Sequence, residues 1–223
     1  MNLTGRTAVI TGGGRGGGAA AAYALAEAGA TVAVAARNEE QVVDVAAQLR
    51  QRGYEAFAFR CDVTDHHQVR DLALSASETM GKVDILINNA GNVRDKSFAK
   101  MDLDDFRSLI DVHLMGAVYC THAAWPIMKE KGFGRIVMTT SSAGLYGNHG
   151  HTNYGAAKMA LVGLMNSLKE EGQRHNITVN AIAPIALTRM SEQAVMPKFA
   201  PLMKPEFVTA VVAWLCAPDN TDP

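Results

Sequence analysis

One stretch decides the fold of this chain: Thr11-Gly12-Gly13-Gly14-Arg15-Gly16-Gly17-Gly18. It follows a β-branched run, residues 7–11, that predicts a strand, and precedes an alanine-rich segment, residues 19–28, that predicts a helix. A backbone without side chains can turn tightly between the two, and the amide N–H groups that open the helix can approach a pyrophosphate. The alternative is a merely flexible loop, which would cost conformational entropy unless a ligand bound it. We therefore predict a dinucleotide site at this turn.

The rest of the chain alternates between strand and helix signals. Short apolar runs predict strands over residues 31–35, 55–59, 83–87, 135–139 and 178–182. Helical signals fill the gaps: Asn38 to Gly53, Thr64 or Asp65 to Gly81, 103–129, 153–171 and 204–215. Parallel strands joined by helices need right-handed crossovers, so helices must cover both faces of the sheet. The predicted fold class is α/β: a Rossmann-like doubly wound parallel sheet in a single domain over residues 1–223.

Two details of the helices follow from the same patterns. Apolar faces are expected at Val42, Val43, Ala46 and Leu49 in one helix, and at Val69, Leu72, Leu74 and Met80 in the next. Pro126 is expected to kink the long helix or to end its regular part, because proline cannot donate the helical hydrogen bond.

Composition narrows the class of protein. The 223 residues are 48% hydrophobic and 19% charged, which is enough for a full core and unlike a disordered chain. The net charge is -1 and like charges do not cluster, which argues against a nucleic-acid partner. No apolar run reaches the ~18 residues of a membrane span, and residues 1–11 lack the order of a signal peptide. Three cysteines without CxxC spacing indicate reduced thiols, so we expect a cytoplasmic enzyme or binding domain.

The end of the second strand bears on the choice of cofactor. An acidic side chain there would hydrogen-bond the ribose hydroxyls of NAD, whereas a basic one accommodates the additional phosphate of NADP. This chain has Ala36 and Arg37 at that point and no carboxylate until Glu39, while Arg15 adds a second positive charge. The alternative is a solvated Arg37 beside a first-turn helix anion, Glu39. The pattern favours NADP(H), with NAD(H) possible.

Residues able to transfer a proton follow the fourth and fifth strands. Asn88-Asn89-Ala90-Gly91 ends the fourth strand, Ser141 and Ser142 end the fifth, and Tyr154 and Lys158 share one face of the next helix. A lysine ammonium there would favour the phenolate and lower the tyrosine pKa from its usual ~10. Such a tyrosine exchanges a proton with a carbinol oxygen, and a nearby serine hydroxyl holds that oxygen. The alternative is an exposed tyrosine and a solvated lysine.

On these motifs the chain resembles the short-chain dehydrogenases/reductases over essentially its whole length. Their Thr-Gly-x-x-x-Gly-x-Gly falls on Thr11, Gly12, Gly16 and Gly18, their adenine-contacting pair on Asp62-Val63, and their catalytic residues on Ser141, Tyr154 and Lys158. The resemblance implies a small-molecule substrate and a homodimer or homotetramer. The cofactor-binding residues it implies, together with the two arginines above, are Gly12, Gly14, Arg15, Gly16, Gly17, Gly18, Arg37, Asp62, Val63, Asn89, Ala90, Gly91, Tyr154, Lys158, Pro184 and Thr188.

The chain departs from that family's pattern at four places. Gly17 stands where a large aliphatic residue is usual, and Pro184-Ile185 replaces the usual Pro-Gly. His113 stands where the family has a proton-relay asparagine, and we count it as a fourth catalytic residue because histidine can hold a water or pass a proton. The family's last strand is expected to be absent, since no strand signal follows the last helix.

The second half of the chain looks like one subgroup, the (3R)-hydroxyacyl-CoA dehydrogenase domain of the peroxisomal multifunctional β-oxidation enzyme. The region of the second strand looks more like 3-oxoacyl thioester reductases. The resemblance implies an NAD(P)(H)-dependent oxidoreductase that interconverts 3-oxoacyl and 3-hydroxyacyl thioesters, with Tyr154 as the acid and base. The alternatives are a short-chain enzyme for another alcohol or ketone, and a non-catalytic nucleotide-binding scaffold or sensor.

Two further groups of residues carry weaker signals. The seven histidines lack nearby cysteines or paired carboxylates, so we expect no metal, and we expect His149 or His151 to line the mouth of the substrate site. A Met-rich apolar stretch occupies residues 186–204 and is broken by prolines. It is either ordinary core or a flap over an acyl chain.

Overall fold

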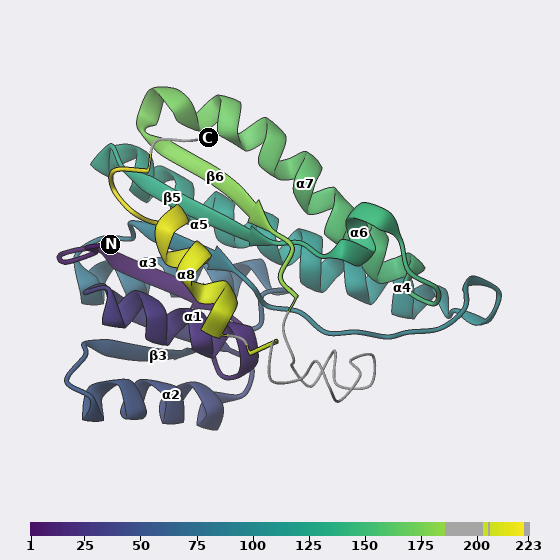
Figure 1. Ribbon diagram of the computed structural model, residues 1–223, viewed down its shortest axis with the longest axis horizontal. Helices are drawn as coiled ribbons and strands as arrows, with labels where there is room; N and C mark the ends of the chain where they lie inside the picture. The colour runs from purple at the N-terminus through teal and green to yellow at the C-terminus, as the bar shows by residue number, and fades with distance from the viewer. Residues whose placement is uncertain (186–202, 205, 221–223) are drawn as a thin grey trace.

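The computed structural model describes residues 1–185, 203–204 and 206–220. Its centre is one parallel sheet in the order β3-β2-β1-β4-β5-β6 (Figure 1). The strands are β1 (Thr7–Thr11), β2 (Thr31–Ala36), β3 (Ala56–Arg60), β4 (Ile85–Asn88), β5 (Gly134–Thr139) and β6 (Ile177–Ile182). This confirms the predicted doubly wound sheet. Within the part of the chain that the structure describes, β6 is the last strand and lies at the edge of the sheet.

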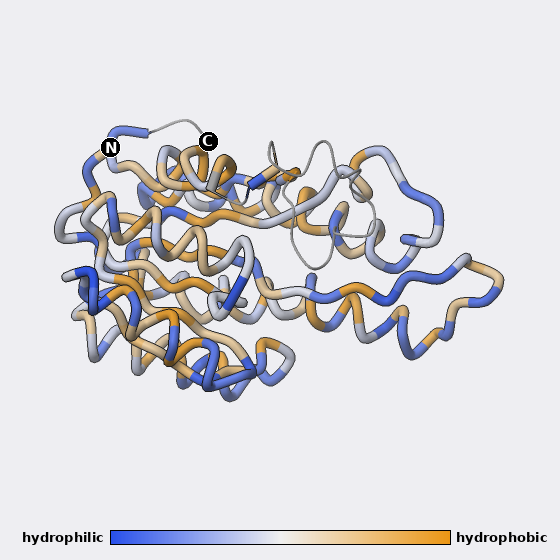
Figure 2. Tube along the Cα trace, turned by 60° about the horizontal axis from the view of Figure 1, so that its bottom comes forward, coloured by the Kyte–Doolittle hydropathy of each residue, from blue (hydrophilic) through white to orange (hydrophobic). Residues whose placement is uncertain are grey.

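Helices cover both faces of the sheet (Figure 1). On one face α1 (Gly16–Glu27), α2 (Glu39–Gln51) and α8 (Glu206–Leu215) enclose the first hydrophobic core, with Leu25, Leu49 and Val212 among its residues. On the other face α3 (His66–Met80), α5 (Gly116–Lys131) and α7 (Thr152–Gly172) enclose the second. β1 and β4 are buried at every residue, as expected for a sheet covered on both faces, and Figure 2 shows the hydrophobic stretches along the trace in orange.

The predicted long helix is divided. It consists of α4 (Leu103–Ile110), a wider π-helical turn (Asp111–Met115) and α5. Pro126 lies inside α5, which continues to Lys131, so the prediction that the regular helix ends there is wrong. The π-helical turn contains His113, which is buried. π-helical turns of this kind are frequent at functional sites.

Two residues assigned to apolar helix faces are half-exposed. Val43 in α2 is 47% exposed and Leu74 in α3 is 51% exposed, whereas Val42, Leu49, Val69 and Leu72 are buried. Each helix turns about 100° per residue, so the side chain next to a core residue points away from the core. Asp65 rather than Thr64 caps α3, because its side chain accepts hydrogen bonds from the N–H groups of His67 and Gln68.

The strand order fixes where a ligand can bind. β1 pairs with β2 on one side and with β4 on the other, so the connections run in opposite directions from this point. Beyond the carboxyl ends of β1 and β4 the connections leave a crevice, the usual ligand site of open α/β sheets. Within the described residues no helix is long and apolar enough to cross a membrane.

Candidate active site

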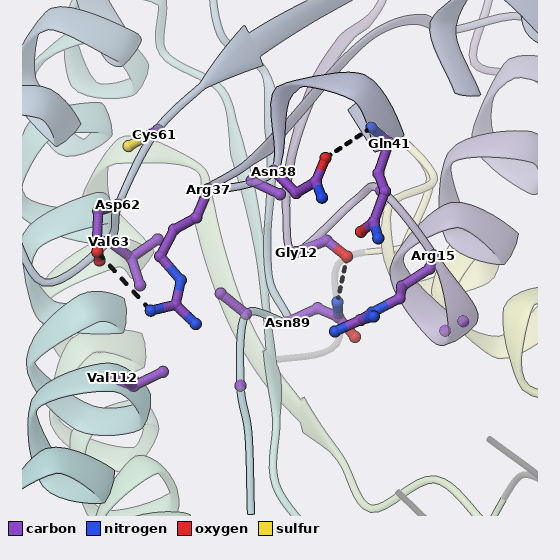
Figure 3. Close-up of a pocket in the computed structure, with 16 residues that line it drawn as sticks. Gly12, Arg15, Arg37, Asn38, Gln41, Cys61, Asp62, Val63, Asn89 and Val112 are labelled. Carbon is purple, nitrogen blue, oxygen red and sulfur yellow. Dashed lines mark hydrogen bonds and ion pairs between the residues drawn. The ribbon is translucent and has the colours of Figure 1, made fainter. Parts of the chain in front are cut away.

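The first of two large cavities lies at this crevice, beside the glycine loop. It has a volume of about 400 Å³ and runs from the start of α1 to the ends of β2 and β3 (Figure 3). Most of the cofactor residues expected from the sequence line it: Gly12, Gly14, Arg15, Gly16, Gly17, Arg37, Asp62, Val63, Asn89, Ala90 and Gly91. Sequence reasoning named Ala36 only for its missing carboxylate and left out Asn38, Gln41, Cys61 and Val112, although each of these four lies within four residues of a predicted site residue.

Close packing explains why the loop needs glycine. Gly12 and Gly16 have φ angles of 65° and 56°, which side chains disfavour. Gly18 does not line the cavity. A Cβ atom there would lie 2.2 Å from the Gly12 carbonyl oxygen, so this glycine lets α1 approach the turn. Gly17 differs, since a Cβ atom would meet only Asn89 Oδ1, at 3.6 Å. The space that a large aliphatic residue would fill is therefore open.

Asn89 holds the loop against the end of β4. Its Nδ2 group donates to the Thr11 carbonyl at 3.1 Å and to the Gly12 carbonyl at 3.3 Å. In return, Thr11 Oγ1 accepts from the N–H groups of Asn89 and Ala90 at 3.1 and 3.2 Å. These bonds join the glycine motif after β1 to the Asn88–Gly91 motif at the end of β4. They fix the backbone along one wall of the cavity.

Arg37 lies in the part of this cavity formed by the ends of β2 and β3. Its guanidinium lies 4.0 Å from the Asp62 carboxylate, and its side chain is 66% exposed. Figure 3 shows Arg37 beside Asp62 and Arg15 across the cavity from them. An exposed ion pair at this distance is weak, so an incoming phosphate can replace Asp62 as the partner of Arg37.

The second cavity, of about 290 Å³, adjoins the first and shares Gly17, Asn89 and Gly91 with it. It brings together Ser141 at the end of β5, Tyr154 and Lys158 on α7, and His113. Its remaining wall is largely apolar and includes Ala21, Ile182, Val208 and Val212 from α1, β6 and α8. Pro184 lines this cavity rather than the first. Thr188 and most of the 186–204 stretch lie outside the described residues.

Burial controls the electrostatics of this cavity. Lys158 is 3% exposed, burial lowers its pKa to about 7, and its Nζ donates to the Thr139 carbonyl at 2.5 Å. Burial also raises the pKa of Tyr154. The hydrogen bond with Ser141 lowers this pKa by less than burial raises it, and the charge of Asp95 raises it further. The expectation that Lys158 lowers the tyrosine pKa is therefore not met. The lysine is itself only partly charged near neutral pH and is directed at a backbone carbonyl.

His113 lines the second cavity. Its Nε2 atom lies 2.8 Å from the Asn92 carbonyl oxygen, and its ring meets the Tyr154 ring edge-on at 5.2 Å between centroids. A Cβ atom on Gly91 would lie 2.4 Å from His113 Cε1, so only glycine fits against this ring. Burial and the nearby Lys158 lower the pKa of His113 to about 3. The imidazole is therefore neutral at physiological pH.

The mouth of the second cavity contains His151 but not His149. His151 Nε2 lies 3.0 Å from an Asp95 oxygen, and its Nδ1 lies 2.8 Å from the Asn148 amide nitrogen. A backbone bond from Lys96 N–H to the Gly150 carbonyl joins the same two loops. The loops after β4 and before α7 therefore form one rim, with the His151 ring 5.8 Å from that of Tyr154.

Comparisons with known proteins place the chain in a family. The model of the short chain dehydrogenase family matches residues 6–197. Peroxisomal multifunctional enzyme type 2 of Drosophila melanogaster is 42% identical over 95% of this chain, which covers 36% of that longer protein. The 3-oxoacyl-[acyl-carrier-protein] reductase of a Synechocystis strain is 35% identical, covering 99% of this chain and 91% of the reductase.

A solved structure agrees with these relatives. A 7α-hydroxysteroid dehydrogenase complexed with NADH and a 7-oxo bile acid superposes with a TM-score of 0.91 at 33% identity, covering 97% of this chain and 89% of the other. Fold, motifs and site geometry agree with the family match. This chain therefore belongs to the short chain dehydrogenase family and is an NAD(P)-dependent oxidoreductase.

Proposed function

We propose that this enzyme interconverts 3-oxoacyl and 3-hydroxyacyl thioesters. The observation that carries the proposal is the second cavity, in which Ser141, Tyr154 and Lys158 face an apolar wall. A flexible acyl chain can lie along such a wall, while its oxo group reaches the hydroxyls. The multifunctional enzyme and the acyl-carrier-protein reductase among the relatives support the same substrate class.

Each catalytic side chain has a role that its environment suits. In the reductive direction Tyr154 donates its phenolic proton to the carbonyl oxygen, and its raised pKa keeps that proton in place at neutral pH. The Ser141 hydroxyl donates a hydrogen bond to the same oxygen. Lys158 holds the ribose and exchanges protons readily, because its pKa is about 7. A nicotinamide cofactor held in the first cavity would supply or accept the hydride.

The first cavity fits that cofactor. Gly16 and Gly17, the first residues of α1, line this cavity without side chains, so the backbone there is free to meet a pyrophosphate. Arg37 and Arg15 favour an additional phosphate, and Ala36 offers no carboxylate to the ribose hydroxyls. We therefore propose NADP(H) as the preferred cofactor, with NAD(H) also accepted.

Steady-state kinetics with acetoacetyl-CoA and both reduced cofactors test this function. We expect saturable turnover with NADPH and slower turnover with NADH. Turnover of a ketone panel without turnover of the thioester would favour the second candidate, an enzyme for another alcohol or ketone. The similar hydroxysteroid dehydrogenase makes a steroid ketone the first member of that panel. Cofactor binding without any turnover would identify a scaffold or sensor.

A further inference from the structure

A third, much smaller cavity shares Val112 with the first large cavity, and His113 and Lys158 with the second. It offers about 10 Å³ to a water-sized sphere and is lined by Asn88, His113 and Lys158 among other residues. In the described part of the chain, three buried side-chain atoms lack a hydrogen-bond partner: Asn88 Oδ1, Asn92 Oδ1 and His113 Nδ1. Two of these three therefore belong to residues that line one cavity. Such atoms are rare in folded proteins and call for an explanation.

The His113 atom in question is an acceptor. Nε2 lies 2.8 Å from the Asn92 carbonyl oxygen, which can only accept, so Nε2 carries the proton of the neutral ring. Nδ1 consequently has a lone pair and no hydrogen. The Asn92 N–H group, at 3.3 Å from the same Nε2, makes at best a weak contact with it.

The Asn88 atom is also an acceptor. Its Nδ2 donates to Thr121 Oγ1 at 3.0 Å and contacts the Met138 sulfur at 3.4 Å, which leaves Oδ1 without a donor. Lys158 lines the same cavity and has further N–H donors, but its Nζ donates to the Thr139 carbonyl and makes no hydrogen bond to either acceptor. Two acceptors on one cavity require a donor with two hydrogens. Water is such a donor, and a cavity needs only ~10–15 Å³ to hold one molecule.

We propose that one internal water binds in this cavity, donating one O–H to Asn88 Oδ1 and the other to His113 Nδ1. Asn88 thereby becomes a positioning residue that acts through His113. The water keeps the proton of His113 on Nε2, and that N–H holds the Asn92 carbonyl. The kinetic consequence rests on the proposed function, because the His113 ring meets the ring of Tyr154, the proposed proton donor, edge-on.

The water and the tautomer can be tested without any activity. In the ¹⁵N-histidine-labelled full-length protein at pH 7, two-bond ¹H–¹⁵N correlations should show His113 protonated on Nε2 alone. The His113→Asn spectrum assigns the signal among the seven histidines. A high-resolution crystal structure should show a water within hydrogen-bond distance of both acceptors. A proton on Nδ1, or an Asn88 amide turned so that Nδ2 meets Nδ1 directly, would overturn the proposal.

A double-mutant cycle tests the positioning role. Asn88→Leu should lower kcat about tenfold in the wild-type background, and less than about twofold in the His113→Asn background. The loss is smaller in that background because the side-chain amide of His113→Asn carries both a donor and an acceptor. It can therefore bind the Asn92 carbonyl and N–H groups without the water. An equal loss of kcat in both backgrounds would show that Asn88 does not act through His113 and has only a structural role.

Met138→Leu is the matched control, because Met138 contacts the same amide from its Nδ2 side. It should have the same effect in both backgrounds. If Asn88→Leu does not fold, the spectrum and crystal structure of the wild type still decide whether the water is present. If the wild type does not reduce thioesters, the proposed function fails while these two measurements remain valid.

Discussion

The two large cavities are built in different ways. The first is shaped mainly by backbone: glycines let α1 and the turn approach, and Asn89 ties the turn to β4. The second is shaped by side chains from α7, β5, α8 and the π-helical turn, and burial sets their charge states. A cavity made of backbone tolerates little added volume, whereas a cavity made of buried ionisable groups is sensitive to charge. The predictions below test this difference.

The largest effect is expected at Tyr154. Tyr154→Phe keeps the ring and removes only the proton donor, so turnover should fall by ~10²–10⁴. The dissociation constant for NADPH, measured by fluorescence titration, should stay within about twofold. More than a tenth of the wild-type activity in the variant would contradict the role given to Tyr154.

Adding one methyl group should have different effects at the neighbouring glycines Gly17 and Gly18. Gly18→Ala places a Cβ atom 2.2 Å from the Gly12 carbonyl, so the turn must shift. Overpacking of this kind costs roughly 1–3 kcal/mol, which we expect as a ten- to hundredfold weaker cofactor affinity. Gly17→Ala is the control, since its Cβ meets nothing closer than 3.6 Å. Equal effects of both variants would show that close packing does not define this cavity.

Burial of Lys158 should make stability depend on pH. The folded protein releases the lysine proton near pH 7 and the unfolded chain near the ordinary 10.5, so stability rises with pH between these values. We expect Lys158→Met to be more stable than the wild type at pH 6–7, and this advantage to shrink by about 1–2 kcal/mol at pH 9.

Urea unfolding at pH 6, 7.5 and 9 measures this trend. Lys129→Met, which replaces an exposed lysine in the last turn of α5, serves as the control and should show a constant difference from the wild type. An advantage of Lys158→Met that stays constant over this range would mean that the lysine is not buried as described.

Two substitutions of His113, which lines the second cavity, should show whether its shape or its polarity matters. His113→Asn retains a polar group that can bind the Asn92 backbone, and we expect kcat within about threefold of the wild type. His113→Leu leaves the Asn92 carbonyl without its donor, and we expect a loss of about tenfold. If leucine leaves the rate unchanged, His113 is only a packing residue.

The sequence predicted the backbone cavity better than the side-chain cavity. β1 was predicted to the residue, because a β-branched run is directly bounded by glycine. The glycine motif, the end of the second strand, Asp62-Val63 and the Asn88–Gly91 motif together identified most residues that line the first cavity. Ser141, Tyr154 and Lys158 were also expected together, and the structure brings them together. The direction of the Tyr154 pKa shift was not predicted correctly, because it is set by burial, and burial depends on tertiary packing.

The interruption of the long helix was missed for a similar reason. The apolar pattern of residues 103–129 continues through the π-helical turn, so local periodicity gives no sign of it. Close packing follows directly after the turn, at Gly116, where a Cβ atom would lie 2.8 Å from the Val63 side chain. Val63 comes from a distant part of the chain, and its proximity cannot be derived from the helix alone.

The smallest effect is expected where the backbone cavity meets solvent, at Arg37. A charge-assisted hydrogen bond to the additional phosphate of NADPH is worth about 1.5–3 kcal/mol when shielded from water. The Arg37 side chain is 66% exposed and already lies near Asp62, so we expect only about a three- to tenfold preference for NADPH. Arg37→Ala should remove most of it, and Ala36→Asp should reverse it by repelling the phosphate. Dissociation constants for NADPH and NADH, measured at low and at physiological salt, test this ranking, because screening weakens exposed pairs. A wild type that already binds NADH more tightly would show that the end of β2 selects for NAD despite its lack of a carboxylate.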